Sequence, residues 1–255
     1  MKPVPAGATG RFQERAVAAD LQGSFAAIWI HQLPTEKAPP VIVAPDGTID
    51  LQWIDGVLRV AGPDKDPKTE ILPAGATVIG FRFRPAAAAQ WLGIPASELI
   101  GQRLELEDLW GSKAHRLISK INSRQKGGVI EALEAALADH MPENPADAVM
   151  SAAYALVEMG APSGAPLVPW LARSLAMSER TLRRRFDESF GYGPKTLDRI
   201  LRYQRFLRLS RASRLPVAVI AAEAGYADQA HLARERKRLT GLVSSDSTMP
   251  EPGES

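Results

Sequence analysis

The sequence predicts an α+β N-terminal domain, a small antiparallel sheet with helices, followed by an all-α domain. Three observations predict this order. Short apolar runs separated by turn sequences fill the first half of the 255-residue chain, helical periodicity fills the last third, and the net charge changes sign between them. The segment GAPSGAPLVP at 160–169, rich in proline and glycine, lies where the charge changes and is typical of a linker.

These boundaries divide the chain into four parts. We expect a sensing or dimerising domain over 1–160, a linker over 161–169, a helical domain over 170–245 and a disordered tail over 246–255. A change of composition and charge at a linker supports two domains with different partners.

The strands of the first domain are predicted by five short runs, FAAIWI, VIVAP, TIDLQW, VLRV and TVIGFRF. Turn sequences separate them, namely PDG, IDG, AGPDKDP and PAGA. Helices are predicted at PAAAAQWLG, at GGVIEALEAALADH and at NPADAVMSAAYALVEMG, where Asn144 is expected to cap the helix and Pro145 to lie in its first turn.

The charge of the chain is unevenly distributed, although its net value is only +2. Residues 1–165 carry 15 basic and 19 acidic side chains, a net of −4, and residues 166–241 carry 16 basic and 7 acidic side chains, a net of +9. The last 14 residues carry three acidic side chains and no basic one. A strongly basic block suits a partner that is a polyanion, because neutralising phosphates releases counterions.

Composition also argues against several classes of protein. The chain has no cysteine, and its four histidines have no ligand spacing, so we expect no metal and no cofactor. The sequence motifs G-x-S-x-G, G-x-x-x-x-G-K-[ST] and H-E-x-x-H do not occur, so we expect no enzyme. No apolar run approaches roughly 20 residues, so we expect no membrane partner and a cytoplasmic location.

The helical domain begins with two short helices in LARSLAMSERTLRRRFDESFG, separated near Ala176. Ser178 is expected to cap the second of them. On a helical wheel, Arg180, Arg183 and Arg184 share one sector, and the leucine and phenylalanines of this helix fall on the opposite side. A helix that packs by one face and presents arginines on the other suits the major groove of DNA.

The same arrangement occurs again about 50 residues later. After the long helix PKTLDRILRYQRFLRLSR comes a short apolar helix, a turn at Gly225, a cap at Asp228 and a basic helix. A single basic helix can be explained as a solvated surface helix. Because the turn, the cap and the basic helix occur twice, two recognition helices are the favoured interpretation.

This tandem arrangement resembles the DNA-binding domain of AraC/XylS-type transcription regulators, two helix-turn-helix units joined by one long helix. LARSLAMSERTLRRRFDESFGYGPKTL is similar to the first unit and VAVIAAEAGYADQAHLARERKRLTGL to the second. The N-terminal half is similar to a domain that precedes this module in many bacterial regulators.

The resemblance implies which side chains meet DNA. Two groups are expected to face bases or phosphates. The base-facing side chains are Arg180, Arg183, Arg184, Gln229, Ala230 and Arg234, and those near phosphates are His231 and Lys237. Arginine can bond guanine and glutamine can bond adenine through two parallel hydrogen bonds, whereas alanine offers only apolar contact. Four other arginines are expected to be solvated or near phosphates, namely Arg185, Arg199, Arg202 and Arg205.

Two departures from the family's pattern lie in the second unit. Arg236 stands where the family has an aromatic residue, and VSSDSTM after Gly241 lacks the usual proline and aromatic. The arginine stem is expected to lie along the apolar surface with its charge at the edge. The first unit therefore matches the family more fully.

The N-terminal domain leaves alternatives open. Asp46 and Asp50 could be polar groups of a ligand pocket, but an Asp-Gly hairpin turn is the preferred interpretation. Four aromatic residues could surround an effector, but are expected to form the core: Trp29, Trp53, Phe81 and Phe83.

The expected function is sequence-specific transcription regulation as an activator, with double-stranded DNA as partner. RNA polymerase, a small-molecule effector and a second copy of the chain are further candidate partners. The alternative is an enzyme or small-molecule-binding protein that its basic domain only tethers to nucleic acid.

Overall fold

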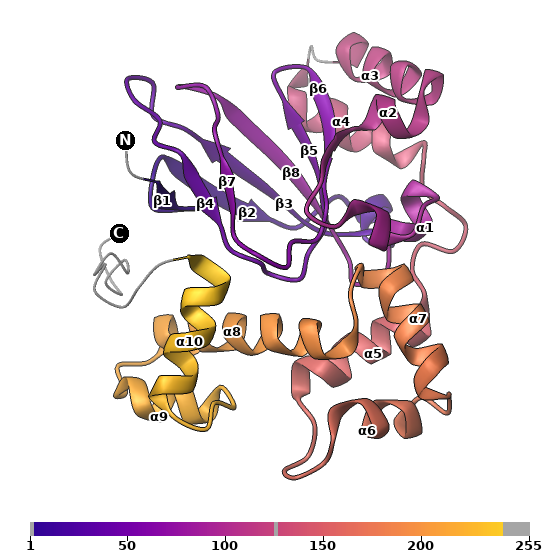
Figure 1. Cartoon of the computed structure of the whole chain (residues 1–255). Helices are drawn as coiled ribbons and strands as arrows, with labels where there is room; N and C mark the ends of the chain where they lie inside the picture. Colours follow the sequence, from indigo (N-terminus) through magenta and orange to yellow (C-terminus); the bar gives the residue numbers. More distant parts are fainter. Residues whose placement is uncertain (1–2, 125–126, 242–255) are drawn as a thin grey trace.

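The computed structural model describes residues 3–124 and 127–241. Figure 1 shows a β-rich part, formed by the N-terminal half, above a layer of helices formed by the C-terminal part. This confirms the predicted fold class. The disordered tail expected over 246–255, and the departure after Gly241, lie outside the described residues.

Six strands form one sheet in which every neighbouring pair is antiparallel, in the order β2-β3-β8-β5-β6-β9. Their bounds are Arg11–Arg15 (β2), Phe25–Gln32 (β3), Asp50–Ile54 (β5), Val57–Ala61 (β6), Thr77–Phe83 (β8) and Arg103–Glu105 (β9). Asp55 and Gly56, both at positive φ, form the tight turn between β5 and β6.

A second, three-stranded sheet has the order β1-β4-β7, with β1 parallel to β4 and β7 antiparallel to it. Its strands are Val4–Pro5 (β1), Val41–Val43 (β4) and Lys68–Glu70 (β7). Because β4 and β5 belong to different sheets, Asp46 and Gly47 do not close a hairpin, and that preferred interpretation is wrong. Asp46 Oδ1 instead accepts hydrogen bonds from the amide (3.0 Å) and hydroxyl (2.7 Å) of Thr48, a local turn that redirects the chain.

The two faces of the large sheet differ because side chains alternate along each strand. Ile79, Phe81 and Phe83 of β8 enter the main core, whereas Arg82 between them lies on the opposite face and pairs with Asp50. Of the four aromatic residues expected in the core, only Trp29 lies outside this cluster. It is buried on the polar face.

Helices cover the apolar face and supply the rest of the main core. They are η1 (Ala19–Leu21), α1 (Ala88–Leu92), η2 (Ala96–Leu99), α2 (Leu106–Trp110), α3 (Ser112–Arg124) and α4 (Val129–Ala138).

The C-terminal part consists of helices around a second core. They are α5 (Ala148–Met159), α6 (Leu167–Ser174), α7 (Glu179–Phe190), α8 (Pro194–Ala212), α9 (Val217–Glu223) and α10 (Gln229–Thr240). In Figure 1, α7 and α10 stand at opposite ends of α8, the long helix that joins them.

Three details of the expected boundaries differ from the structure. Asp147, not Asn144, caps α5, because its carboxylate accepts the amides of Val149 and Met150 at 3.0 and 3.1 Å. Helix α6 begins at Leu167, inside the expected linker. Helix α5, expected in the N-terminal domain, packs into the second core through Met150, Ala153 and Val157.

The two parts also contact each other directly. Gln204 of α8 donates a 2.9 Å hydrogen bond to the carbonyl of Pro45. Gly47 lies so close to α8 that a Cβ there would stand 3.3 Å from Leu201 Cδ2 and 3.4 Å from Leu197 Cδ1. Glycine at this position, with φ of +82°, therefore serves both the turn and the close approach of α8.

Candidate nucleic-acid interface

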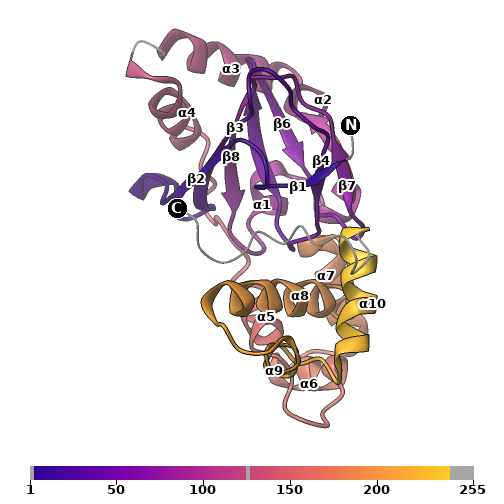
Figure 2. The ribbon, with the colours of Figure 1, turned by 90° about the vertical axis from the view of Figure 1, so that its left-hand side faces the viewer.

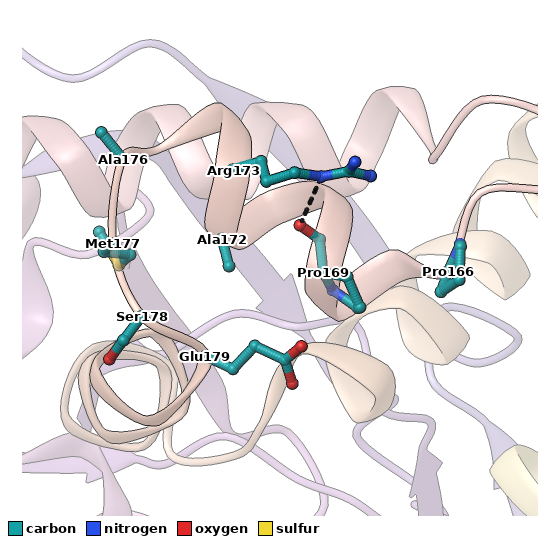
Figure 3. A pocket seen from close by; sticks show the side chains of 8 residues that line it. All are labelled: Pro166, Pro169, Ala172, Arg173, Ala176, Met177, Ser178 and Glu179. Carbon is teal, nitrogen blue, oxygen red and sulfur yellow. Dashed lines mark hydrogen bonds between the residues drawn. The ribbon is translucent and has the colours of Figure 1, made fainter.

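Helices α6 and α7 form the first helix-turn-helix unit. Ala176 makes the turn at a φ of +50°, and the hydroxyl of Ser178 caps α7 by accepting the Thr181 amide at 3.1 Å. A hollow of about 650 Å³ lies between α6 and the start of α7 (Figure 3). Two prolines, two alanines and Met177 form its apolar lining. Arg173, Ser178 and Glu179 supply its polar groups, with Arg173 Nε donating to the Pro169 carbonyl at 3.3 Å.

Helices α9 and α10 form the second unit in the same way. Gly225, at a φ of +92°, makes the turn, and Tyr226 is buried after it. The Asp228 carboxylate caps α10 by accepting the His231 amide at 2.6 Å. Both caps agree with the sequence prediction.

On α7, the predicted division into two faces is present. Leu182, Phe186 and Phe190 are buried, and the three arginines predicted to face bases are exposed. Each end of this arginine face carries an ion pair within the helix. The Glu179 carboxylate lies 3.3 Å from Arg183 and that of Glu188 lies 2.7 Å from Arg184.

On α10, Leu232 and Leu239 are buried, and the opposite face is exposed. The exposed residues include five of the predicted contacts or their neighbours: Gln229, Ala230, Arg234, Lys237 and Arg238. Arg238, one helical turn after Arg234, belongs to the same basic helix but was not among the predicted contacts. His231 is half-buried, and its ring packs edge-on against Tyr226 with centroids 5.2 Å apart.

The two helices differ in charge. Helix α7 carries four arginines and three acidic residues, whereas α10 carries four basic residues and one acidic residue. That one acid, Glu235, lies 3.4 Å from Arg199 of α8. Within the described residues, no hydrogen bond or ion pair engages the side chains of Arg234, Lys237 or Arg238. The second unit therefore presents the more positive surface.

The four arginines expected to be solvated or near phosphates are instead engaged inside the domain. Arg185 bonds Asp147 at 2.5 Å, Arg199 approaches Glu235 and Arg202 pairs with Asp198. Arg205 donates to the backbone carbonyls of Glu158 and Ala224, and so ties α8 to the ends of α5 and α9. The solvated alternative is wrong, because each of these side chains points from its helix toward a neighbouring acid or carbonyl. Their contact with phosphates stays a prediction.

Arg236 borders a groove of about 410 Å³ between α8, α9 and α10. Its side chain is half-buried, and the lining includes Phe206, Ile220 and Leu232. No acidic side chain lines the groove, and no described residue forms an ion pair with Arg236. The stem therefore lies along the apolar surface, as expected.

Asp46 and Asp50 meet at Arg82 on the polar face of the sheet. The guanidinium lies 3.3 Å from Asp50 and 3.4 Å from Asp46, and Trp29 Nε1 donates to Asp50 at 3.1 Å. Burial raises the pKa of Asp50 above its usual value, and the charge of Arg82 opposes this only in part. A cavity of about 200 Å³ lies beside this cluster, between the sheet and α7.

The described parts of the chain contain no group of three or more His, Asp or Glu side chains that could hold a metal ion. In the same ranges, no helix combines the length and apolar character that crossing a membrane requires.

Comparison with solved structures gives low sequence identities. An apo form of ToxT from Vibrio cholerae shares 12% identity, with a TM-score of 0.48 over 91% of this chain and 97% of that chain. ToxT bound to an unsaturated fatty acid shares 12%, with a TM-score of 0.45 over 90% and 95%. The AraC-like transcriptional activator CuxR shares 16%, with a TM-score of 0.24 over 77% and 86%.

Comparison with family models assigns two parts of the chain. Residues 171–246 match the family described as a helix-turn-helix domain, and this range begins inside α6 and includes α7, α8, α9 and α10. Residues 13–105 match a domain of unknown function (DUF6597). Neither description names an enzymatic activity, and no curated protein matches the sequence.

Proposed function

We propose that this chain, whose residues 171–246 form an AraC-type helix-turn-helix domain, is a sequence-specific DNA-binding transcription regulator. The observation that carries the proposal is the pairing of two capped helices, α7 and α10, at opposite ends of α8, each with one buried apolar face and one exposed face that carries arginine.

The two recognition helices enter successive major-groove segments on one face of the duplex. Arg180, Arg183 and Arg184 read bases from α7. Gln229, Ala230 and Arg234 read bases from α10, with Lys237 and the exposed Arg238 near phosphates. The ring of His231 is partly buried, which favours a position near a DNA phosphate over a contact with a base.

The difference in charge supports a division of work between the units. Helix α10 supplies most of the electrostatic attraction to phosphates, because no acidic residue in the described part of the chain pairs with its cations. Helix α7 supplies discrimination between DNA sequences. Glu179 and Glu188 offset its attraction to phosphates, so its affinity depends mainly on contacts with bases.

The N-terminal domain carries the regulation, through an effector or a partner, and a second copy of the chain and RNA polymerase are candidate partners. The polar cluster around Arg82 lies beside the junction with α7 and α8, which supports a regulatory role for this region.

Footprinting on a selected DNA site tests the proposal. We expect two protected patches per chain on one face of the duplex, about 34 Å or one turn apart. Arg234→Glu should remove one patch and Arg184→Glu the other. Equal affinity for all sequences, with no discrete footprint, would favour a basic domain that only tethers the chain to nucleic acid.

A further inference from the structure

One loop of the N-terminal domain touches the ends of both recognition helices. The loop joins β6 to β7 and spans residues 62–67, the sequence GPDKDP. At its start, Pro63 Cγ lies 2.9 Å from the position that a Cβ of Gly191 would take. At its end, Pro67 Cγ lies 3.7 Å from the corresponding position at Gly241.

These two glycines hold equivalent positions. Gly191 is the left-handed C-cap of α7, and Gly241 is the left-handed C-cap of α10. Figure 2 shows α10 ending directly beneath β7. The same six-residue loop therefore spans from one recognition helix to the other.

The contact with α7 is close. A Cβ at Gly191 would lie 2.8 Å from the Ala96 carbonyl oxygen and 3.0 Å from Ile100 Cγ1, which leaves no room for a larger residue. The end of α7 is thus seated between this loop and the η2 segment.

Buried ion pairs and backbone hydrogen bonds hold the loop itself in place. Asp64 is 7% exposed, and its carboxylate lies 2.7 Å from Arg103 of β9. Arg103 also lies 2.6 Å from Glu70 of β7. The Gly62 amide donates to Gln102 at 3.0 Å, and the Gly101 amide donates to the Pro63 carbonyl at 2.9 Å. Two prolines further restrict its backbone.

Without this loop, the relation between α7 and α10 would depend on α8 and the helices packed on it. Long helices curve gently, so a small bend in the 19 residues of α8 would change how its two ends are related. A second, anchored connection between the two units removes that freedom.

We propose that the loop 62–67 is a positioning element that fixes the placement of α7 relative to α10, and that Asp64 is its anchoring residue. The consequence for DNA, a strict preference for one spacing between the two bound segments, rests on the proposed function. The placement itself is a property of the protein and can be measured without DNA.

The chain has no cysteine, so spin labels can be attached at chosen positions. In the full chain, the exposed residues Asp187 of α7 and Arg238 of α10 are changed by Asp187→Cys and Arg238→Cys and labelled. The distance between the labels is then measured by pulsed electron paramagnetic resonance. We expect one narrow distribution.

Asp64→Asn should widen or shift this distribution, because it removes the charge that pairs with Arg103. Asp66→Asn is the matched control, since Asp66 is exposed in the same loop and should leave the distribution unchanged. Pro67→Gly removes the ring at the α10 end while keeping the Asp64 anchor, and should also widen it. Circular dichroism and thermal unfolding establish that each variant is folded.

A folded Asp64→Asn chain with the parent's distribution would overturn the proposal. If Asp64→Asn does not fold, the same criterion applies to Pro67→Gly: a folded Pro67→Gly chain with the parent's distribution would overturn the proposal. A widened distribution in the labelled chain, together with no specific DNA binding by the parent chain without cysteine substitutions, would uphold the positioning role and contradict the proposed function. Where DNA binds, Asp64→Asn should also weaken the preference for one spacing over sites lengthened or shortened by a base pair.

Discussion

Arg185 of α7 donates a 2.5 Å hydrogen bond to Asp147, the residue that caps α5. One carboxylate thus serves two elements, because Asp147 also accepts the amides of Val149 and Met150. Burial by itself raises the pKa of Asp147, but the bonds from Arg185 and from these amides outweigh it, so the pKa lies below its ordinary value.

Asp147→Ala should lower the free energy of unfolding by about 1–2 kcal/mol, because it removes the cap and leaves Arg185 unpaired. Asp147→Asn keeps a capping oxygen and should cost less. A group whose folded pKa is depressed contributes stability above its unfolded pKa, about 3.9 for aspartate, and loses it as the pH falls through the folded pKa. Urea unfolding between neutral and acidic pH should therefore show a weaker acid dependence in Asp147→Asn than in the parent, and identical dependences would contradict this account.

Arg184→Ala should weaken binding to the selected site by about 1–3 kcal/mol and relax the preference at one base pair. Its exposed pair with Glu188 is worth at most about 0.5 kcal/mol, so the arginine can leave it for a base. Lys237→Ala should instead weaken binding to all sequences and reduce the salt slope by about 0.9. Binding titrations on selected and random DNA at several salt concentrations separate the two, and equal losses on both DNAs for Arg184→Ala would refute its role at a base.

Arg236→Phe should raise the free energy of unfolding of the full chain by about 1 kcal/mol, because an aromatic ring fills the groove lined by Phe206 and Leu232 better than an arginine stem. Glu235, one possible partner for this arginine, approaches Arg199 instead. Arg234→Phe, on the exposed face of α10, is the control and should give no such gain. Base preference should be unchanged in Arg236→Phe. A loss of stability in urea unfolding would mean that Arg236 makes an interaction that this packing does not include.

Ala176→Gly should stabilise the first unit. The left-handed conformation of Ala176 costs a non-glycine residue roughly 1–2 kcal/mol, which glycine avoids. Glycine also raises the conformational entropy of the unfolded chain, and this offsets part of the gain in stability. A net gain of about 0.5 kcal/mol is expected in chemical unfolding. Ala155→Gly, the same change at an exposed position inside α5, should destabilise by about 1 kcal/mol. If both variants were destabilised equally, the conformation at Ala176 would carry no strain.

The features that local chemistry determines were predictable from the sequence. Alternating or apolar runs located five strands, and the Ser178 and Asp228 caps located the starts of α7 and α10. The exposed and buried faces of these helices followed from helical periodicity. Strands β2 and β7 were missed because RFQER and KTE are short and polar, with no apolar side to reveal them.

Interactions between distant residues were not predictable. Arg185 and Asp147 are 38 positions apart, and nothing in the local sequence of either indicates the other. The same reason explains why Arg199 and Arg205 were expected to be solvated, and why Asp46 was expected in a hairpin rather than at Arg82. The sequence of the loop 62–67 predicted a turn, but it did not predict the contacts of this loop with α7 and α10.

The packing of α5 also determines where this protein can be divided. A chimaera that joined a foreign sensory domain at the glycine-rich segment 160–169 would leave α5 behind, and with it Met150, Ala153 and Val157, which fill the core beneath α7 and α8. The transplanted module would begin with an apolar cavity open to water, and Arg185 would lose its carboxylate acceptor and Arg205 one of its two carbonyl acceptors. Exchange of modules in this architecture should therefore succeed only at a junction before Asp147, so that α5 travels with the helices it supports.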